Sequence, residues 1–300
     1  MAVVVAQSRM GLSYFLFALL SLAVLALLPV IGIRNPVSEQ VVLGSIQGIT
    51  EWLPISSEGM IILAKTHLFA QEADAATLVR EAIFLHIGTL AATLIYFRKD
   101  IGSLVRASFV TRSPTGETRP MLRFLLVSTL VSGAIGLVLF QALDAAGDRL
   151  NVTGKVITVG IGSLLMGTGL ALLASKGKGL KEQGDLKNTD GVILGIAQGL
   201  SILPGVSRSG ITVSSLLLRK FRDVHALRAS FLMSVPAVLG ANIGLNVRHM
   251  DFSAAQGIGL VLAFAFGILT IHLLMDLSRR INFGKFVLLF AILVVISAFI

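Results

Sequence analysis

Two short segments of this chain combine polar side chains with helix-breaking residues inside otherwise apolar sequence. The first segment, QGITEWLPISSEG (47–59), contains two carboxylates and two adjacent serines: Glu51, Ser56, Ser57 and Glu58. The second segment, LPGVSRSGIT (203–212), places Arg208 between two serines. Ionisable side chains within apolar segments are costly to bury and are therefore candidates for function. We expect the chemistry of this protein to lie in these two segments.

The second segment has the composition of a phosphate site. The planar guanidinium of an arginine matches the geometry of a phosphate group. Backbone N–H groups at the start of a helix also attract an anion. We predict phosphate contacts from one arginine, four hydroxyl residues and a glycine: Arg208, Ser207, Ser209, Thr212, Ser56 and Gly205. A single serine of this kind is more typical of a helix N-cap, whereas the whole set in two similar segments favours a site.

Glu51 and Ser57 complete the predicted reaction. A carboxylate does not approach a phosphate unless it is protonated or holds a cation. Glu51 therefore suits a general base that activates Ser57 or a water molecule, or a ligand for a divalent ion. Together with Arg208, these residues predict hydrolysis of a phosphoanhydride on a lipid.

The composition predicts an integral membrane protein. Of the 300 residues, 55% are hydrophobic and 14% are charged, whereas an average soluble domain has about 25% charged residues. The apolar runs approach the roughly 20 residues that a helix needs to cross a bilayer, and helices satisfy their own backbone groups there. The net charge of +9 lies mainly in short loops, which fits membrane orientation and not a nucleic-acid partner. The absence of cysteine excludes thiolate chemistry.

The fold class expected is an all-α polytopic membrane protein with about seven full spans. Residues 34–40 read as a linker, and 98–120 reads as a basic loop. Residues 11–33 read as an uncleaved span, because their apolar run exceeds that of a signal peptide. The predicted spans are 11–33, 77–97, 121–143, 156–175, 226–247, 252–275 and 286–300.

Two further apolar regions, 41–64 and 191–218, are interrupted by proline, glycine and small hydroxyl residues. Each half is too short to cross a membrane, so we predict two re-entrant broken-helix hairpins. QGITEWLPISSEG (47–59) also resembles QGLSILPGVSRSG (198–210), which indicates an internal repeat. The excess of Lys and Arg in alternate loops makes the repeat inverted in topology, with the hairpins entering from opposite faces and meeting near the midplane.

The domain organisation follows from this repeat. Residues 1–40 form an extra N-terminal span and linker. Residues 41–175 form the first repeat, and residues 176–300 form the second, each with one hairpin and three spans.

The motifs resemble those of the undecaprenyl-diphosphatase family linked to bacitracin resistance. That family has EGxTEFLPxSSTGH where this chain has QGITEWLPISSEGM, and its PGxSRSGxT is matched fully by PGVSRSGIT (204–212). ALRASFLMSVPAVLGA (226–241) is similar to a third family segment, and the resemblance extends from about residue 41 to the C-terminus. It implies a membrane enzyme that removes one phosphate from a polyprenyl diphosphate.

The resemblance also implies roles for single residues and a cofactor. Glu51 corresponds to the key motif glutamate, Ser57 to a nucleophile or phosphate ligand, and Arg208 to the phosphate-binding arginine. A divalent cation, Mg²⁺ or Ca²⁺, is implied as a cofactor, with Glu51 as its candidate ligand.

The chain departs from the family pattern at three positions of the first motif. Gln47 replaces a glutamate, Glu58 replaces a threonine, and Met60 replaces a histidine that is a candidate acid or base. We predict that His86 or Glu58 supports catalysis in place of that histidine. Gln47, Glu58 and the equivalent Gln198 of the second segment are predicted to have supporting roles.

Three functions are compatible with these residues. The first is a polyprenyl-diphosphate phosphatase of the plasma membrane that recycles a lipid carrier for the cell envelope. The second is a transporter or flippase of polyprenyl phosphate, because inverted repeats with broken helices are typical of transporters. The third is a binding-only relative, since Met60 can act neither as an acid nor as a base. The sequence leaves the polyprenyl length and the choice between monomer and homodimer open.

Overall fold

The computed structural model describes residues 35–69, 75–109, 117–147, 154–174, 179–246, 253–277 and 283–297. In these ranges the regular elements are helices, and one isolated β-bridge joins Lys181 to Phe221. The expected all-α class is confirmed, while the predicted span 11–33 lies outside the described residues. The α-helices are α2 (Pro36–Thr50), α3 (Ser57–Leu63), α4 (Ala75–Tyr96), α5 (Arg98–Phe109), α6 (Thr118–Gly147), α7 (Gly154–Ala174), α8 (Asn188–Leu200), α9 (Arg208–Leu218), α10 (Asp223–Ala241), α11 (Ala254–Leu277) and α12 (Phe283–Ser297).

Short helices of other types accompany them: the π-helices η1 (Ala64–Leu68) and η3 (Asn242–Asn246), and the 3₁₀ helix η2 (Gln183–Asp185). Within the described part of the chain, four helical segments are long and apolar enough to cross a membrane: Thr77–Tyr96, Thr118–Ala145, Asp223–Asn246 and Ala254–Met275. They coincide with four predicted spans. The predicted spans 156–175 and 286–300 correspond to shorter apolar segments, Thr158–Ala174 and Val287–Ile296.

Two expectations about connecting segments were wrong. The presumed linker 34–40 contains the first turn of α2, because Asn35 caps that helix: its Oδ1 accepts from the Ser38 N–H at 2.9 Å. Pro36 follows the cap, where its fixed φ suits a helix start. The presumed loop 98–120 contains α5, whose polar and apolar residues fall on separate faces of a helix.

The two interrupted regions are broken helices, as their prolines and glycines predict. The chain leaves α2 after Thr50 and re-enters helix at Ser57, and it leaves α8 after Leu200 and re-enters helix at Arg208. Each second helix begins with a serine N-cap. Ser56 Oγ accepts from the Gly59 N–H at 3.1 Å, and Ser207 Oγ accepts from the Gly210 N–H at 3.2 Å. The two caps have nearly the same backbone angles, φ −67° and ψ 113° against φ −68° and ψ 114°.

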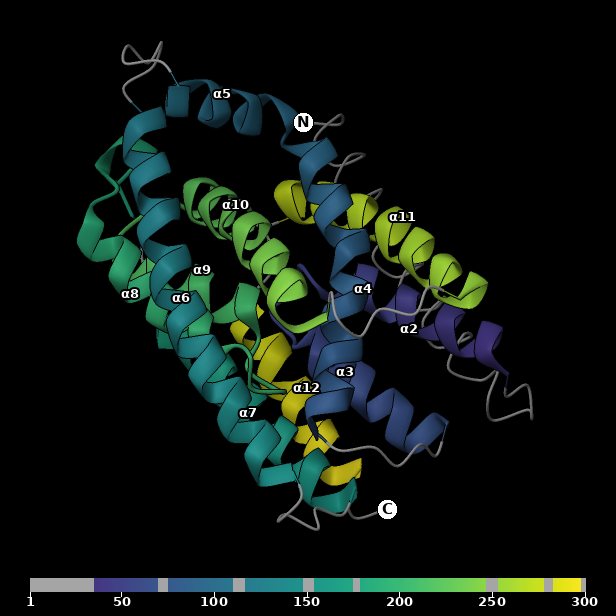
Figure 1. Ribbon diagram of the computed structural model, residues 1–300. Helices are drawn as coiled ribbons and strands as arrows, with labels where there is room; N and C mark the ends of the chain where they lie inside the picture. The colour runs from purple at the N-terminus through teal and green to yellow at the C-terminus, as the bar shows by residue number, and fades with distance from the viewer. Residues whose placement is uncertain are drawn as a thin grey trace, which may run out of the picture.

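Glycines bring the first half of each broken helix against a long helix. α2 packs along α11, and α8 packs along α6 (Figure 1). A Cβ on Gly48 would lie 2.8 Å from the Ala263 carbonyl oxygen, and a Cβ on Gly199 would lie 3.2 Å from that of Ser132. Larger residues would push these helices apart, so both breaks depend on glycine for their position.

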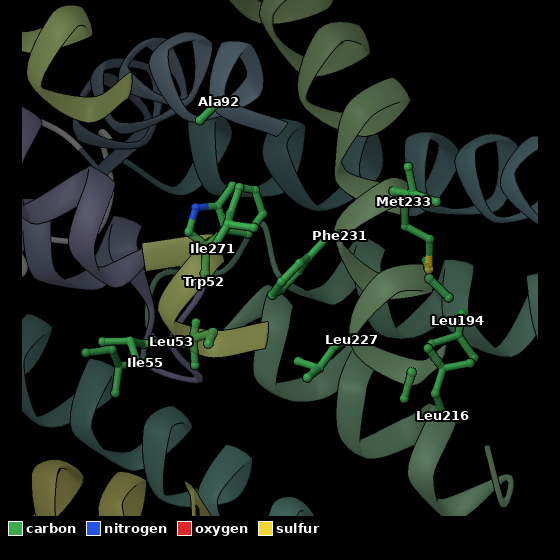
Figure 2. Close-up of a cluster of buried hydrophobic side chains, with 14 of the residues drawn as sticks. Trp52, Leu53, Ile55, Ala92, Leu194, Leu216, Leu227, Phe231, Met233 and Ile271 are labelled. Carbon is green, nitrogen blue, oxygen red and sulfur yellow. The ribbon is translucent and has the colours of Figure 1, made fainter. Parts of the chain in front are cut away.

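α10 lies between α4 and α6 in the middle of the molecule (Figure 1). The first break contributes Trp52 and Leu53 to the apolar core, and α10 contributes Leu227, Phe231 and Met233 (Figure 2). The rings of Trp52 and Phe231 meet edge to face, with centroids 4.9 Å apart. This contact fixes the first break against the central helix, so the polar residues next to Trp52 have a rigid support.

Candidate functional site

The two breaks touch each other directly, as the sequence predicts. The backbone N–H of Gly205 donates to Ser56 Oγ at 3.1 Å, and Ser209 Oγ donates to the Leu53 carbonyl oxygen at 2.7 Å. Gly205 has a φ of +101°, and a Cβ there would lie 2.7 Å from Ile161 of α7. A glycine is therefore required at this turn by both its conformation and its packing.

Glu51 and Arg208 form an ion pair across this junction. Glu51 Oε1 lies 2.5 Å from an Arg208 terminal nitrogen, and both side chains are largely buried, with exposures of 3% and 10%. The other terminal nitrogen of Arg208 donates to the Ser230 carbonyl oxygen at 3.1 Å, and its guanidinium carbon lies 5.4 Å from the centre of the Trp52 ring. A guanidinium group that is held by three neighbours in this way is preorganised to bind an anion.

The second oxygen of Glu51 accepts from three side chains. Ser57 Oγ donates at 2.7 Å, Gln47 Nε2 donates at 2.9 Å, and His86 Nε2 lies 2.9 Å away. Gln47 also donates to Thr89 Oγ1 at 3.3 Å. The carboxylate therefore gathers the predicted residues Gln47, Ser57 and His86 around one atom, and it joins them to Arg208.

His86 is held in its doubly protonated form by its neighbours. Its Nδ1 lies 2.8 Å from the Ala82 carbonyl oxygen, while its Nε2 faces Glu51 and lies 3.5 Å from Glu58 Oε1. All three neighbours are hydrogen-bond acceptors, so both ring nitrogens must donate. The site thus contains two cations, Arg208 and His86, and two carboxylates.

The predicted hydroxyl residues of the second break are engaged with the backbone. Ser207 caps α9, Ser209 bonds Leu53, and Thr212 Oγ1 lies 2.7 Å from the Arg208 carbonyl oxygen and 2.6 Å from Ser230 Oγ. Ser56 caps α3 and accepts from Gly205. In this arrangement these hydroxyl residues stabilise the two helix breaks. A direct contact between them and a phosphate stays a prediction.

A cavity of about 310 Å³ lies beside the junction, among α4, α6, α8 and α10. Glu58, His86 and Arg208 line it, whereas its lining does not include Glu51 or Ser57. Glu51 therefore lies behind the side chains that form the cavity wall. The rest of the wall is mostly apolar or small. Its polar residues come from α6, from the end of α8 and from α10: Thr129, Ser132, Gln198, Ser201 and Ser234.

Several residues of this site were missed by sequence reasoning. Trp52 and Ser230 hold Arg208, and Thr129 and Ser132 line the cavity. Thr129 and Ser132 are three residues apart and precede two glycines in an apolar helix, which is the signal that could have indicated a polar face. Met60 is absent from the lining and packs against the apolar cluster around Val42.

The geometry around Glu51 does not fit a metal ligand. Both of its oxygens are occupied by positively charged or hydrogen-donating groups. Among the described residues, no group of three or more His, Asp or Glu side chains is arranged to hold a metal ion. Hard divalent cations need several oxygen ligands, which the protein side chains around Glu51 do not offer.

The described residues form a helical membrane protein with a buried site at the junction of two broken helices, where two cations and two carboxylates meet. Comparison with known proteins gives the family. The chain matches the family described as Bacitracin resistance protein BacA over residues 40–296, and it belongs to that family.

Its relatives include proteins named undecaprenyl-diphosphatase. The one from Methanococcoides burtonii is 39% identical over 270 residues, covering 87% of this chain and 98% of the relative. The one from Haloarcula marismortui is 36% identical, covering 83% and 92%. The one from Syntrophotalea carbinolica is also 36% identical, covering 80% and 89%. The similarity therefore extends over nearly the whole length of these proteins.

Proposed function

We propose that this protein hydrolyses an undecaprenyl-type diphosphate to the lipid monophosphate and inorganic phosphate. The observation that carries the proposal is a cavity lined by two largely buried cations, Arg208 and His86, and otherwise mostly by apolar or small residues. That combination suits an amphiphile with an anionic head. The relatives named undecaprenyl-diphosphatase support the same substrate.

The lipid tail is proposed to leave between α6 and α10. Gly133 of α6 and Gly240 of α10 line the cavity, are exposed, and have open space where a side chain would be. A volume of about 310 Å³ is at the lower end of ligand pockets, which span about 300–1,000 Å³. The cavity would therefore hold the diphosphate and the start of the chain, with the remainder of the tail in the bilayer.

In the proposed reaction, Arg208 and His86 bind the terminal phosphate. Glu58 faces the cavity and accepts a proton from a water molecule as the water oxygen attacks the terminal phosphorus. The bond from that phosphorus to the bridging oxygen breaks, and the electron pair leaves with the lipid monophosphate. Glu51 keeps both cations charged and in position through its two oxygens.

A second mechanism uses Ser57 as the nucleophile. Its hydroxyl donates to Glu51 at 2.7 Å. In this route Glu51 takes the proton as Ser57 Oγ attacks the terminal phosphorus, the bond to the bridging oxygen breaks and the lipid monophosphate leaves, and a water molecule then hydrolyses the phosphoserine to inorganic phosphate. Because the cavity lining does not include Ser57, this route requires a rearrangement of α3. Ser57→Ala separates the two mechanisms: phosphate release falls by less than about tenfold if water attacks, and by far more if Ser57 attacks.

A divalent cation, Mg²⁺ or Ca²⁺, is proposed to arrive with the diphosphate and not to occupy a site on the protein alone. The engaged oxygens of Glu51 support this view. Titration calorimetry should then detect cation binding in the presence of a non-hydrolysable lipid diphosphonate and none with the protein alone. Tight binding of the cation to the free protein would contradict the proposal.

An inverted-topology repeat with about seven spans is proposed for the whole chain, as a multi-pass plasma-membrane protein, either alone or as a homodimer. In each half, two glycines four residues apart face two carbonyl oxygens four residues apart: Gly44 and Gly48 face Gly259 and Ala263, and Gly195 and Gly199 face Ser128 and Ser132. The contacts between the tips are also reciprocal, since a Cβ on Gly59 would meet Gly205 and a Cβ on Gly210 would meet Pro54. These paired contacts support a two-fold relation between the halves.

Phosphate release by the purified protein in detergent tests the proposed function. Undecaprenyl diphosphate should yield stoichiometric phosphate and lipid monophosphate. A flippase of polyprenyl phosphate, the alternative that the broken helices favour, would release none.

The variant Glu51→Gln tests the role of Glu51 in the same assay. The change keeps the size of the side chain but removes the charge that holds Arg208 and His86. We expect phosphate release to fall at least about 100-fold while the protein keeps its elution volume in size-exclusion chromatography. Unchanged release would contradict the role of Glu51.

A further inference from the structure

The cavity contains two buried polar atoms that the proposed reaction does not use. Neither Thr129 Oγ1 nor Gln198 Oε1 has a hydrogen-bond partner, and both residues line the cavity. Gln198 is only 5% exposed. A buried polar atom without a partner costs about 1–3 kcal/mol, so a pair of them in one cavity indicates a ligand that satisfies both.

These two residues and Ser132 form one polar surface, which we call the neutral subsite. Gln198 Nε2 donates to Ser132 Oγ at 3.1 Å, which joins α8 to α6. Ser132 in turn donates to the Thr129 carbonyl oxygen at 3.2 Å. The Thr129 hydroxyl can donate to a ligand. Rotation of the Gln198 amide turns its N–H₂ group toward the cavity and its oxygen toward the Ser132 hydroxyl, so Gln198 can also donate to a ligand.

The neutral subsite is followed by the apolar path along the same helix. Thr129, Ser132, Gly133 and Gly136 are spaced i, i+3, i+4 and i+7, so they lie on one face of α6 and all line the cavity. A ligand group bound at Thr129 and Gln198 would therefore lie next to whatever occupies the space beside Gly133 and Gly136. The charged residues Arg208 and His86 belong to other helices, α9 and α4.

We propose that the neutral subsite binds the lipid-linked phosphate of a diphosphate, while Arg208 and His86 bind the terminal phosphate. This inference rests on the proposed function. The inner phosphate of a lipid diphosphate carries one negative charge, whereas the terminal phosphate carries up to two. Uncharged donors suit the former and cations suit the latter. With this division, the phosphoanhydride bond that breaks lies between the neutral subsite and the pair Arg208 and His86. The neutral subsite then holds the phosphate that stays on the lipid.

The test is a binding measurement that does not depend on turnover. Trp52 is the only tryptophan of the chain and lies against Arg208, so its fluorescence reports occupation of the charged site. Two probes are used: farnesyl methylenediphosphonate, which has both phosphorus groups and is not hydrolysed, and inorganic phosphate. The double variant Thr129→Val with Gln198→Leu removes the polar atoms at nearly constant volume.

We expect the double variant to bind the diphosphonate about tenfold more weakly and to bind inorganic phosphate as the wild type does. Retained phosphate binding also shows that the variant is folded. Arg208→Gln should weaken the binding of both probes. Gln183→Leu with Thr270→Val changes a buried glutamine and a buried threonine outside the cavity lining, and it should weaken neither.

Two results would overturn the neutral subsite: unchanged diphosphonate affinity in the double variant, or an equal loss of affinity for both probes. A different result would contradict the proposed function without affecting the neutral subsite. A wild-type protein that binds the diphosphonate but releases no phosphate from the lipid diphosphate would refute hydrolysis and leave the subsite intact.

Discussion

At the scale of single residues, the site is a group of buried charged side chains that stabilise one another. Glu51 contacts two cations through its two oxygens, and burial makes each of these contacts stronger than it would be in water. Glu58 is the carboxylate that faces the cavity. The two glutamates differ in their place in the structure: Glu51 contacts the two cations, and Glu58 lines the cavity.

We predict that Glu58→Gln lowers the turnover number at least about 100-fold with little change in KM. Glu58 is proposed to move a proton and not to bind phosphate, so substrate affinity should depend on it weakly. Steady-state phosphate release over a range of lipid diphosphate concentrations separates the two constants. A large rise in KM with unchanged turnover would show that Glu58 contributes to binding instead.

His86 should respond differently to substitution. In His86→Gln one buried cation beside Glu51 is lost, so we expect a higher KM and weaker inhibition by inorganic phosphate as well as slower turnover. His67→Gln is the matched control, because His67 bonds Thr158 and is not among the residues that line the cavity. Full activity in both His86→Gln and Glu58→Thr would refute a catalytic role for either residue.

At the scale of elements, the site depends on how two broken helices end and restart. Serine caps fix the restart of α3 and α9, and Gly205 allows the second tip to turn against α7 and donate its N–H to Ser56. Because the helix starts are fixed in this way, Arg208 at the first position of α9 reaches Glu51 at the end of α2.

We predict that Gly205→Ala destabilises the protein by at least about 2 kcal/mol, since it adds a Cβ to a residue with positive φ and no free space. Thermal unfolding in detergent, followed by Trp52 fluorescence, measures the effect. Gly160→Ala in α7 is the control, because that glycine has open space around it and alanine favours helix. An equal transition temperature for wild type and Gly205→Ala would show that the turn is not strained.

At the scale of the whole molecule, the cavity requires helices from both halves of the chain. α4 and α6 supply His86 and the glycine face, while α9 and α10 supply Arg208 and the opposite wall. The proposed headgroup site and the proposed tail path therefore form only when the two halves pack together.

We predict that Gly240→Leu raises the KM for undecaprenyl diphosphate at least about tenfold, because the added side chain displaces roughly two methylene groups of the tail at about 0.8 kcal/mol each. Inhibition by inorganic phosphate should not change, since phosphate uses only the charged end. Gly160→Leu is the control, with open space but outside the cavity lining. An unchanged KM would place the tail elsewhere.

The proposed orientation can be tested because the chain has no native cysteine. Ser253 and Ser103 are exposed and lie on the sides that charge counting assigns as outer and cytoplasmic, respectively. A membrane-impermeant maleimide should label Ser253→Cys in intact cells and should label Ser103→Cys only after lysis. The reverse pattern would invert the topology.

The helical membrane class, the two helix breaks and the residues of both motifs could be predicted from the amino-acid sequence alone. These are local properties: apolar run length, helix-breaking residues and the matched spacing of polar side chains decide them without reference to distant contacts. Segments of mixed composition are harder to predict. The sequence predicts a loop at α5 and a linker at the start of α2, because the caps and amphipathic faces of these helices gain stability only against neighbouring elements.

Which polar side chains face the cavity depends on how the helices pack. The sequence presents Ser207, Ser209 and Thr212 beside Arg208 as equal candidates, yet their hydroxyls bond to the backbone, and Arg208 lines the cavity. The sequence places His86 in the same predicted site as Glu51 but does not show that they touch, and it gives no reason to connect Thr129 with Gln198. Those pairings depend on how helices far apart in the chain pack, and packing places each side chain toward the cavity or away from it.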